Sequence, residues 1–295
     1  MESKKAKKLY RALAVLLGLL VFVELLLISC MIADAIAERS ARALPSYAKE
    51  DIAALADKPE DWTEQEIDKL YHQTGLGKSA LLSMKREQYY EDGEFIPLSE
   101  RLQAFQDALF YDGAMEHELV ADVSKRDLMK NYLAPIAPVL EPGDVFVNSS
   151  THTLGFRNGH AALVVNKHGD VLESFEFGVD SSITPRADQW FAESSNFILL
   201  RLKDVDRETR AMIAKEAEEK LLGVRYSLAV GIFSKKDQGT KMRHTHCSHL
   251  VWQAYKNAGY EIDSNGGLIV TPQDIARSPL FEVVQVYGFD PDKLW

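Results

Sequence analysis

The apolar run over residues 12–33 constrains this chain more than any other stretch of its sequence. About 20 apolar residues in helical conformation span a lipid bilayer, and the run reaches that length with Glu24 as its one charged residue. Five basic residues precede it within the first eleven positions, and basic residues beside a span stay on the cytoplasmic side. We therefore predict a membrane anchor or signal segment in residues 1–33, with the rest of the chain outside the cytoplasm.

Three interpretations of this segment stay open. It is an uncleaved N-terminal anchor in the cell membrane, a cleaved secretory signal, or a lipoprotein signal. The last interpretation rests on residues 27–30 (LISC), which resemble a bacterial lipobox with Cys30 as the lipidated residue. Glu24 counts against a lipid-exposed span, because an acid near the bilayer centre costs about 2.5–3.5 kcal/mol on insertion scales.

The charge of the chain changes after residue 11. The whole chain carries −10, and since the first eleven residues carry +4, the remainder carries −14. Nucleic acids bind basic surfaces, so a body with this negative charge excludes nucleic acid as a partner. Cys30 and Cys247 are the two cysteines, and their contexts differ too much for a disulfide framework. Outside the cytoplasm a free Cys247 is a chemical liability unless its thiol is used.

Residues 34–140 form the second predicted region, which is mostly helical. Thr63 resembles a helix start and Gly75 a helix end, because the residues between them have helical apolar spacing. The predicted helical stretches are residues 34–56 with a break at Pro45, 63–75, 79–87, 98–109 and 115–133. A linker, a lid over a site and a structural base are all open roles for this region.

Residues 141–295 form the third predicted region, which begins with a turn at Pro142 and Gly143. Short apolar or alternating runs predict strands, and Gly169 allows a hairpin turn over residues 167–170. The predicted strands are residues 144–147, 160–165, 171–177, 196–202 and 281–287, and the predicted helices cover 206–222 and the run from Cys247. The fold class is therefore α+β, a mainly antiparallel sheet with packed helices.

Cys247 lies where a polar segment, residues 244–249, meets a run with helical apolar spacing. The open N–H groups and the dipole of a helix N-terminus favour a thiolate over a thiol. A base must hold that thiolate, and a third group must orient the base. His160 opens one predicted strand and Glu173 lies within the next, so a hairpin places them within hydrogen-bond reach.

Segments 222–226 (LGVRY) and 246–251 (HCSHLV) resemble the Gly-x-x-Tyr and Asp-Cys-Ser-Gly-Leu/Val core of NlpC-type cysteine peptidases, which have a papain-like fold. In ordinary members the cysteine precedes the histidine. Here Cys247 follows both His160 and Glu173, an order similar to the circularly permuted branch, which includes YiiX/YebB-like and lecithin-retinol-acyltransferase-like proteins. The resemblance covers about residues 141–290, and it implies a permuted papain-like domain.

The resemblance implies roles for four residues. Cys247 is the nucleophile, His160 the base, Glu173 the polar third residue and Tyr226 a neighbour of the oxyanion hole, with the Cys247 N–H as another donor. Two positions depart from the pattern: His246 replaces the usual acidic or aromatic neighbour, and His249 replaces glycine. We expect both imidazoles to crowd the site and to alter substrate choice.

Alternative roles exist for some of these residues. His152 is an alternative orienting or cleft-lining residue, and Glu173 and Tyr226 have ordinary structural interpretations as a strand residue and a core residue. We predict no metal and no cofactor, because His246 and Cys247 are adjacent and point apart on a helix, and no acid is spaced to complete a tetrahedron.

The sequence predicts a membrane-tethered cysteine hydrolase that cleaves an amide through a thioester, with peptidoglycan peptides as the first substrate and the cell wall as a partner. A lipid-directed amidase or acyltransferase and a non-catalytic binding module on the same fold are the alternatives.

Overall fold

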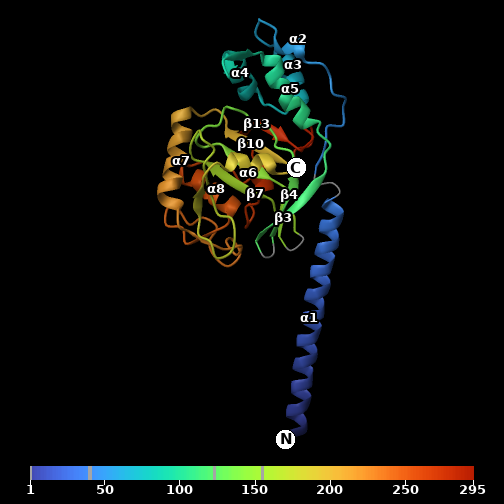
Figure 1. The fold of residues 1–295 in the computed structure, drawn as a ribbon. Helices are drawn as coiled ribbons and strands as arrows, with labels where there is room; N and C mark the ends of the chain where they lie inside the picture. Colours follow the sequence, from blue (N-terminus) through green and yellow to red (C-terminus); the bar gives the residue numbers. More distant parts are fainter. Residues whose placement is uncertain (1, 39–41, 122–123, 154–155) are drawn as a thin grey trace.

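The computed structural model describes residues 2–38, 42–121, 124–153 and 156–295 (Figure 1). The helices in these ranges are α1 (Glu2–Glu38), α2 (Ala53–Ala56), α3 (Glu64–Thr74), α4 (Lys78–Arg86), α5 (Leu98–Leu109), α6 (Ala187–Glu193), α7 (Arg207–Leu221), α8 (Cys247–Asn257) and α9 (Pro272–Ala276). The strands are β1 (Tyr89–Glu91), β2 (Glu94–Ile96), β3 (Met115–Ala121), β4 (Ser124–Met129), β5 (Val145–Asn148), β6 (Thr151–Thr153), β7 (His160–Val164), β8 (Val171–Glu173), β9 (Ser182–Thr184), β10 (Phe197–Leu202), β11 (Arg225–Tyr226), β12 (His244–Thr245) and β13 (Phe281–Tyr287).

The centre of the body is an antiparallel sheet in the order β13-β10-β5-β7-β8-β9. Successive side chains of a strand point to opposite faces, so neighbouring residues of β5 enter different cores. Phe146 packs in one core with apolar residues of α2–α5, whereas Val145 and Val147 pack in the other with α7 and α8. The predicted α+β class, a mainly antiparallel sheet with packed helices, is confirmed.

The strand predictions for residues 141–295 hold with small shifts in their bounds. β13 matches its prediction residue for residue, and the turn over residues 167–170 joins the antiparallel pair β7 and β8, with Gly169 at a φ of +83°. The third strand ends at Glu173 instead of residue 177. The short strands β6, β9, β11 and β12 were missed, because they are too short to show a period.

The helical prediction for residues 63–75 is confirmed in detail. Thr63 and Glu66 form a capping box at the start of α3, and Gly75 ends the helix in the left-handed conformation. The prediction for residues 115–133 is wrong: β3 and β4 form an antiparallel pair, and β4 also pairs with β6. Pairing with a strand distant in sequence overrides weak helical spacing.

The prediction for residues 34–56 is also largely wrong. Residues 42–52 contain no helix, and α2 begins only at Ala53; residues 39–41 lie outside the described part of the chain. The helices that follow pack beside the edge strand β13, where Gly77 N–H donates to the Val284 carbonyl at 2.9 Å. Strand β4 contributes Ser124 to the wall of a pocket.

Helix α1 projects from the body (Figure 1). Residues Lys5–Ala33 are long and apolar enough to cross a membrane, and only 6% of that window is buried. A signal sequence near the N-terminus passes the same test, so an anchor and a cleaved signal both stay open, as does lipidation of Cys30.

Candidate active site

Cys247 is the first residue of α8, and His246 is the N-cap. The helix starts there because residues 244–245 are held as strand β12 beside β11, after which the chain turns into the helix. The Leu250 N–H donates to the His246 carbonyl at 2.9 Å. The first-turn N–H groups of a helix lack intrahelical partners, so the thiol lies at the positive end of the helix dipole.

His160 begins β7 and is buried, with 2% of its surface exposed. Its backbone N–H donates to the Asn148 side chain at 3.1 Å. Gly159 precedes it with a φ of +69°, and a Cβ there would lie 2.3 Å from the Asn148 carbonyl oxygen. Only glycine fits so close to the neighbouring strand, so Gly159 sets the position from which the imidazole enters the pocket.

Glu173 ends β8, and its carboxylate Oε2 lies 2.6 Å from His160 Nε2. In the register of the hairpin, Leu163 pairs with Leu172, which makes His160 and Glu173 diagonal neighbours on one face. The predicted hydrogen bond between the two side chains is therefore confirmed. Thr184 on β9 donates its hydroxyl to Glu173 Oε1, a partner that the sequence analysis missed because β9 shows no sequence signal.

The titration of these groups favours a thiolate–imidazolium pair. Burial alone would raise the pKa of Cys247, but the nearby imidazoles of His160 and His246 hold it well below its usual range. Burial alone would lower the pKa of His160, but the nearby Cys247 and the hydrogen bond to Glu173 raise it to about 9. Burial likewise opposes ionisation of Glu173, yet the His160 hydrogen bond lowers the pKa of that carboxyl.

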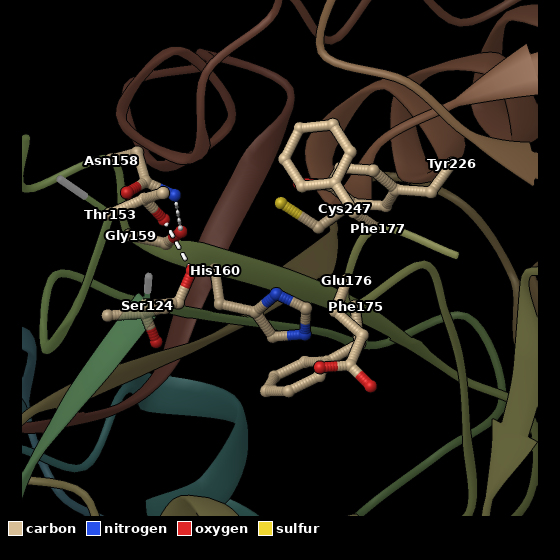
Figure 2. Close-up of a pocket in the computed structure, with 11 residues that line it drawn as sticks. Ser124, Thr153, Asn158, Gly159, His160, Phe175, Glu176, Phe177, Tyr226 and Cys247 are labelled. Carbon is tan, nitrogen blue, oxygen red and sulfur yellow. Dashed lines mark hydrogen bonds between the residues drawn. The ribbon is translucent and has the colours of Figure 1, made fainter. Parts of the chain in front are cut away.

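The side chains of Cys247 and His160 meet at a cavity of about 520 Å³. Figure 2 shows the Cys247 sulfur and one ring nitrogen of His160 facing the same space, while Tyr226 and Phe177 lie beside the sulfur. Residues lining the cavity are Ser124, Thr151, Thr153, Asn158, Gly159, His160, Phe175, Glu176, Phe177, Tyr226 and Cys247. The lining combines hydroxyl and amide groups with aromatic rings, so it suits a polar substrate group with apolar neighbours.

Tyr226 lies on β11 and its ring packs edge-on against Phe177, with centroids 4.8 Å apart. Burial and the nearby Cys247 raise the pKa of Tyr226, so its hydroxyl stays protonated. A protonated hydroxyl beside the sulfur can donate a hydrogen bond to negative charge that develops there.

The two departures from the family pattern have different outcomes. His246 is the N-cap beside Cys247 and lowers the pKa of its thiol, although its side chain does not line the cavity. His249 does not line the cavity: its Nε2 lies 2.7 Å from the Lys236 carbonyl oxygen and its Nδ1 lies 3.0 Å from the Thr245 hydroxyl. Burial lowers the pKa of His249 to about 4, so a neutral ring fastens the preceding loop to α8.

His152, the rival orienting residue, contacts Asp127 and not His160. The Asp127 Oδ1 atom lies 3.1 Å from His152 Nε2 and 2.6 Å from His117 Nδ1, and Arg157 Nη1 lies 2.6 Å from Oδ2. Burial opposes the Asp127 charge, but His152 and Arg157 lower its pKa to about 2. This cluster joins β3, β4 and β6 behind the cavity wall to which Thr151 and Thr153 belong.

The same cluster holds the donor set that a metal ion could use in the described part of the chain. The donor atoms of His117, Asp127 and His152 all lie within 4.8 Å of one another, and imidazole with carboxylate suits zinc. Arg157 already balances the Asp127 charge, so the cluster needs no cation for its electrostatics.

Together, fold and site define a mixed helix and sheet protein in which a cysteine and a histidine line one cavity and a glutamate is hydrogen-bonded to that histidine. No family model matches the chain, and no curated protein matches it. Among solved structures, the chain is similar to one described as the crystal structure of metalloprotein yiiX from Escherichia coli O157:H7, DUF1105. The identity is 20%, the TM-score is 0.37, and the match covers 49% of this chain and 96% of that one. A likeness of this size concerns part of the fold and carries no information about the chemistry at Cys247.

Proposed function

We propose that this chain is a membrane-tethered cysteine hydrolase that cleaves an amide through a thioester intermediate. The observation that carries the proposal is the hydrogen-bonded series Thr184, Glu173 and His160, whose imidazole lines the same cavity as Cys247 at a helix N-terminus. Polar residues are buried in such a series only when each has a partner. The order of these residues, with Cys247 last, also supports a permuted papain-like domain over residues 141–295.

In the proposed mechanism the Cys247 thiolate attacks the carbonyl carbon of the amide. The negative charge that forms on the carbonyl oxygen is stabilised by the Cys247 N–H and the Tyr226 hydroxyl. The imidazolium of His160 gives its proton to the leaving nitrogen, the C–N bond breaks, and a thioester remains. Neutral His160 then takes a proton from water, the hydroxide adds to the thioester, and the thiolate leaves with release of a carboxylic acid.

The pH dependence of Cys247 alkylation tests the proposed function. A thiolate held below its usual pKa persists as pH falls, so the full chain should react with iodoacetamide almost as fast at about pH 6 as at about pH 8. His160→Gln removes the imidazolium, so the midpoint should move up toward roughly 8.5, the value of a free cysteine. Alkylation rates followed by mass spectrometry give both midpoints.

The rate of amide hydrolysis, unlike the rate of alkylation, should fall at alkaline pH. The leaving nitrogen needs the His160 proton, so cleavage should fall as pH rises through about 9. If His160→Gln left the alkylation midpoint unchanged, the proposed pairing of His160 with Cys247 would be wrong.

Tyr226→Phe tests the proposed oxyanion donor. Loss of such a donor costs about 10²–10³ in kcat, and we expect that loss with little change in KM, because the hydroxyl acts only after attack begins. The alkylation midpoint of Cys247 should stay close to that of the unmodified chain. Equal falls in kcat and in alkylation would instead indicate a structural role for the ring.

Peptidoglycan stem peptides are the proposed substrate, since the location and the NlpC-type pattern both favour a peptide amide. A second candidate, a lipid amide, is favoured by exposed apolar side chains near the cavity, of which Phe177 is 59% exposed. Incubation of the full chain with muropeptides and, separately, with N-acyl lipids should yield a new amine from one class only. A chain that releases no amine from either class and whose Cys247 alkylates like a free thiol would be a binding module.

A further inference from the structure

A surface loop joins β11 to β12 over residues 227–243 and is called here the 227–243 loop. Its largest apolar side chains face solvent: Leu228 is 44% exposed, Ile232 52% and Phe233 89%. Leu268, which is 72% exposed, adds to the same surface, because a Cβ at Gly231 would lie 1.7 Å from the Leu268 carbonyl oxygen. Contiguous exposed apolar side chains of this kind mark a binding surface.

The structure holds these side chains outward. Val230 is buried, and the Phe233 N–H donates to the Ala229 carbonyl at 2.9 Å, which closes a turn that ends at Phe233. The base of the loop is fastened to α8 through the Lys236 carbonyl and His249. Exposure of Phe233 therefore follows from a hydrogen-bonded turn.

The charge of this segment is opposite to that of the body. Residues 225–243 carry five basic residues and one acid, within a body of net charge −14. The exposed basic residues are Arg225, Lys235, Lys241 and Arg243. Apolar side chains bordered by lysine and arginine suit the interface of an anionic bilayer, where each basic residue contributes about 1 kcal/mol.

The position of the loop fits the same membrane as α1. In Figure 1 the orange loops that follow α7 extend from the lower side of the body, and α1 also projects below the body. The strands at the two ends of the loop carry Tyr226 and lead into Cys247. A bilayer that holds α1 would thus meet the loop, and the cavity would open close to its surface.

We propose that the 227–243 loop, with Leu268 beside it, binds the surface of an anionic phospholipid bilayer, the one that α1 spans. Phe233, Ile232 and Leu268 enter the headgroup boundary, and the exposed basic side chains contact lipid phosphates. This goes beyond the proposed reaction, because binding needs neither the thiolate nor a substrate.

The test uses the full chain in lipid nanodiscs with a fluorescent nitrobenzoxadiazole label on a single cysteine. In a Cys30→Ser, Cys247→Ala background the label is attached at Phe233→Cys. With phosphatidylglycerol in the disc we expect blue-shifted emission and quenching by doxyl-phosphatidylcholine. Changing Lys235 or Lys241 to glutamate should weaken this partitioning by more than about fivefold for each residue, because the loss of one basic charge alone gives about that factor and glutamate adds a negative charge.

The matched control is a label at Phe95→Cys. Phe95 is 55% exposed on β2, in a hairpin with acidic neighbours between α4 and α5 in the chain. These two helices lie at the end of the body away from α1 (Figure 1). Its label should emit as in water in every disc. Emission at position 233 that equals emission at position 95, or quenching that does not depend on phosphatidylglycerol, would overturn the proposal. Neither result bears on the reaction, which the alkylation of Cys247 tests separately.

Discussion

Cys247→Ala should abolish amide hydrolysis by this chain, with kcat falling by roughly 10⁴–10⁶-fold, the range seen when a covalent nucleophile is removed. The alanine lacks the atom that forms the thioester, and no other thiol lines the cavity among the described residues. The protein should remain folded, because Cys247 is 7% exposed and alanine leaves its helix position occupied. Release of the amine product, followed by chromatography, measures the loss.

Cys30→Ser is the matched control, because it removes the other cysteine without touching the cavity. We expect full hydrolysis and full Cys247 alkylation in that variant. Hydrolysis that survives in Cys247→Ala at a tenth of the normal rate or more would rule out a thioester mechanism. Such a chain would have to use a water nucleophile or a different side chain.

Asp144→Ala should lower the free energy of unfolding by about 3–5 kcal/mol, the cost of leaving a buried charge without its partner. Arg201 donates from Nε and Nη2 to the two Asp144 oxygens at 2.8 and 2.7 Å, and the Asp144 side chain is fully buried. The pair joins β10 to the residue immediately before the neighbouring strand β5. Tyr255 of α8 donates to the adjacent Gly143 carbonyl, so the loss should also loosen the helix that carries Cys247.

Urea unfolding of the full chain in detergent, followed by tryptophan fluorescence, measures this loss. Lys215→Ala breaks an exposed pair with Glu219, whose atoms lie 3.9 Å apart, and should leave the midpoint unchanged. The double variant Asp144→Leu, Arg201→Met should recover part of the stability, because it buries no unpaired charge. Equal midpoints for Asp144→Ala and Lys215→Ala would contradict the prediction.

The sequence predicts the β7–β8 hairpin because the residues that specify it are close together in the chain. Residues 167–170 form a turn between two apolar runs, and the period of two in each run sets which residues share a face. From that pattern alone, His160 and Glu173 were expected in contact, and they are. The capping residue Thr63 and the helix end at Gly75 were predictable for the same reason, since the backbone groups that they satisfy lie within four residues.

Contacts between distant segments were not predictable in this way. Asp127, His117 and His152 meet only because β4 pairs with both β3 and β6, and the sequence around β3 had favoured a helix. Thr184 reaches Glu173 from a three-residue strand, which is too short for a periodic signal. His249 was expected in the site, but its burial on the other side of α8 depends on a loop carbonyl from Lys236.

The sequence by itself determined the apolar span, the α+β class and the contact between His160 and Glu173, because each follows from spacing within a short stretch. That Cys247 joins these two residues in one set is an expectation from the resemblance to NlpC-type peptidases. Only the tertiary structure decided which side chains surround that set. Thr184 donates to Glu173, and His246 lies beside Cys247. His152 contacts Asp127, and His249 contacts the Lys236 carbonyl. The physical reason is that strand register and helix packing select one partner among many within reach, and that selection is made by contacts between segments far apart in the chain.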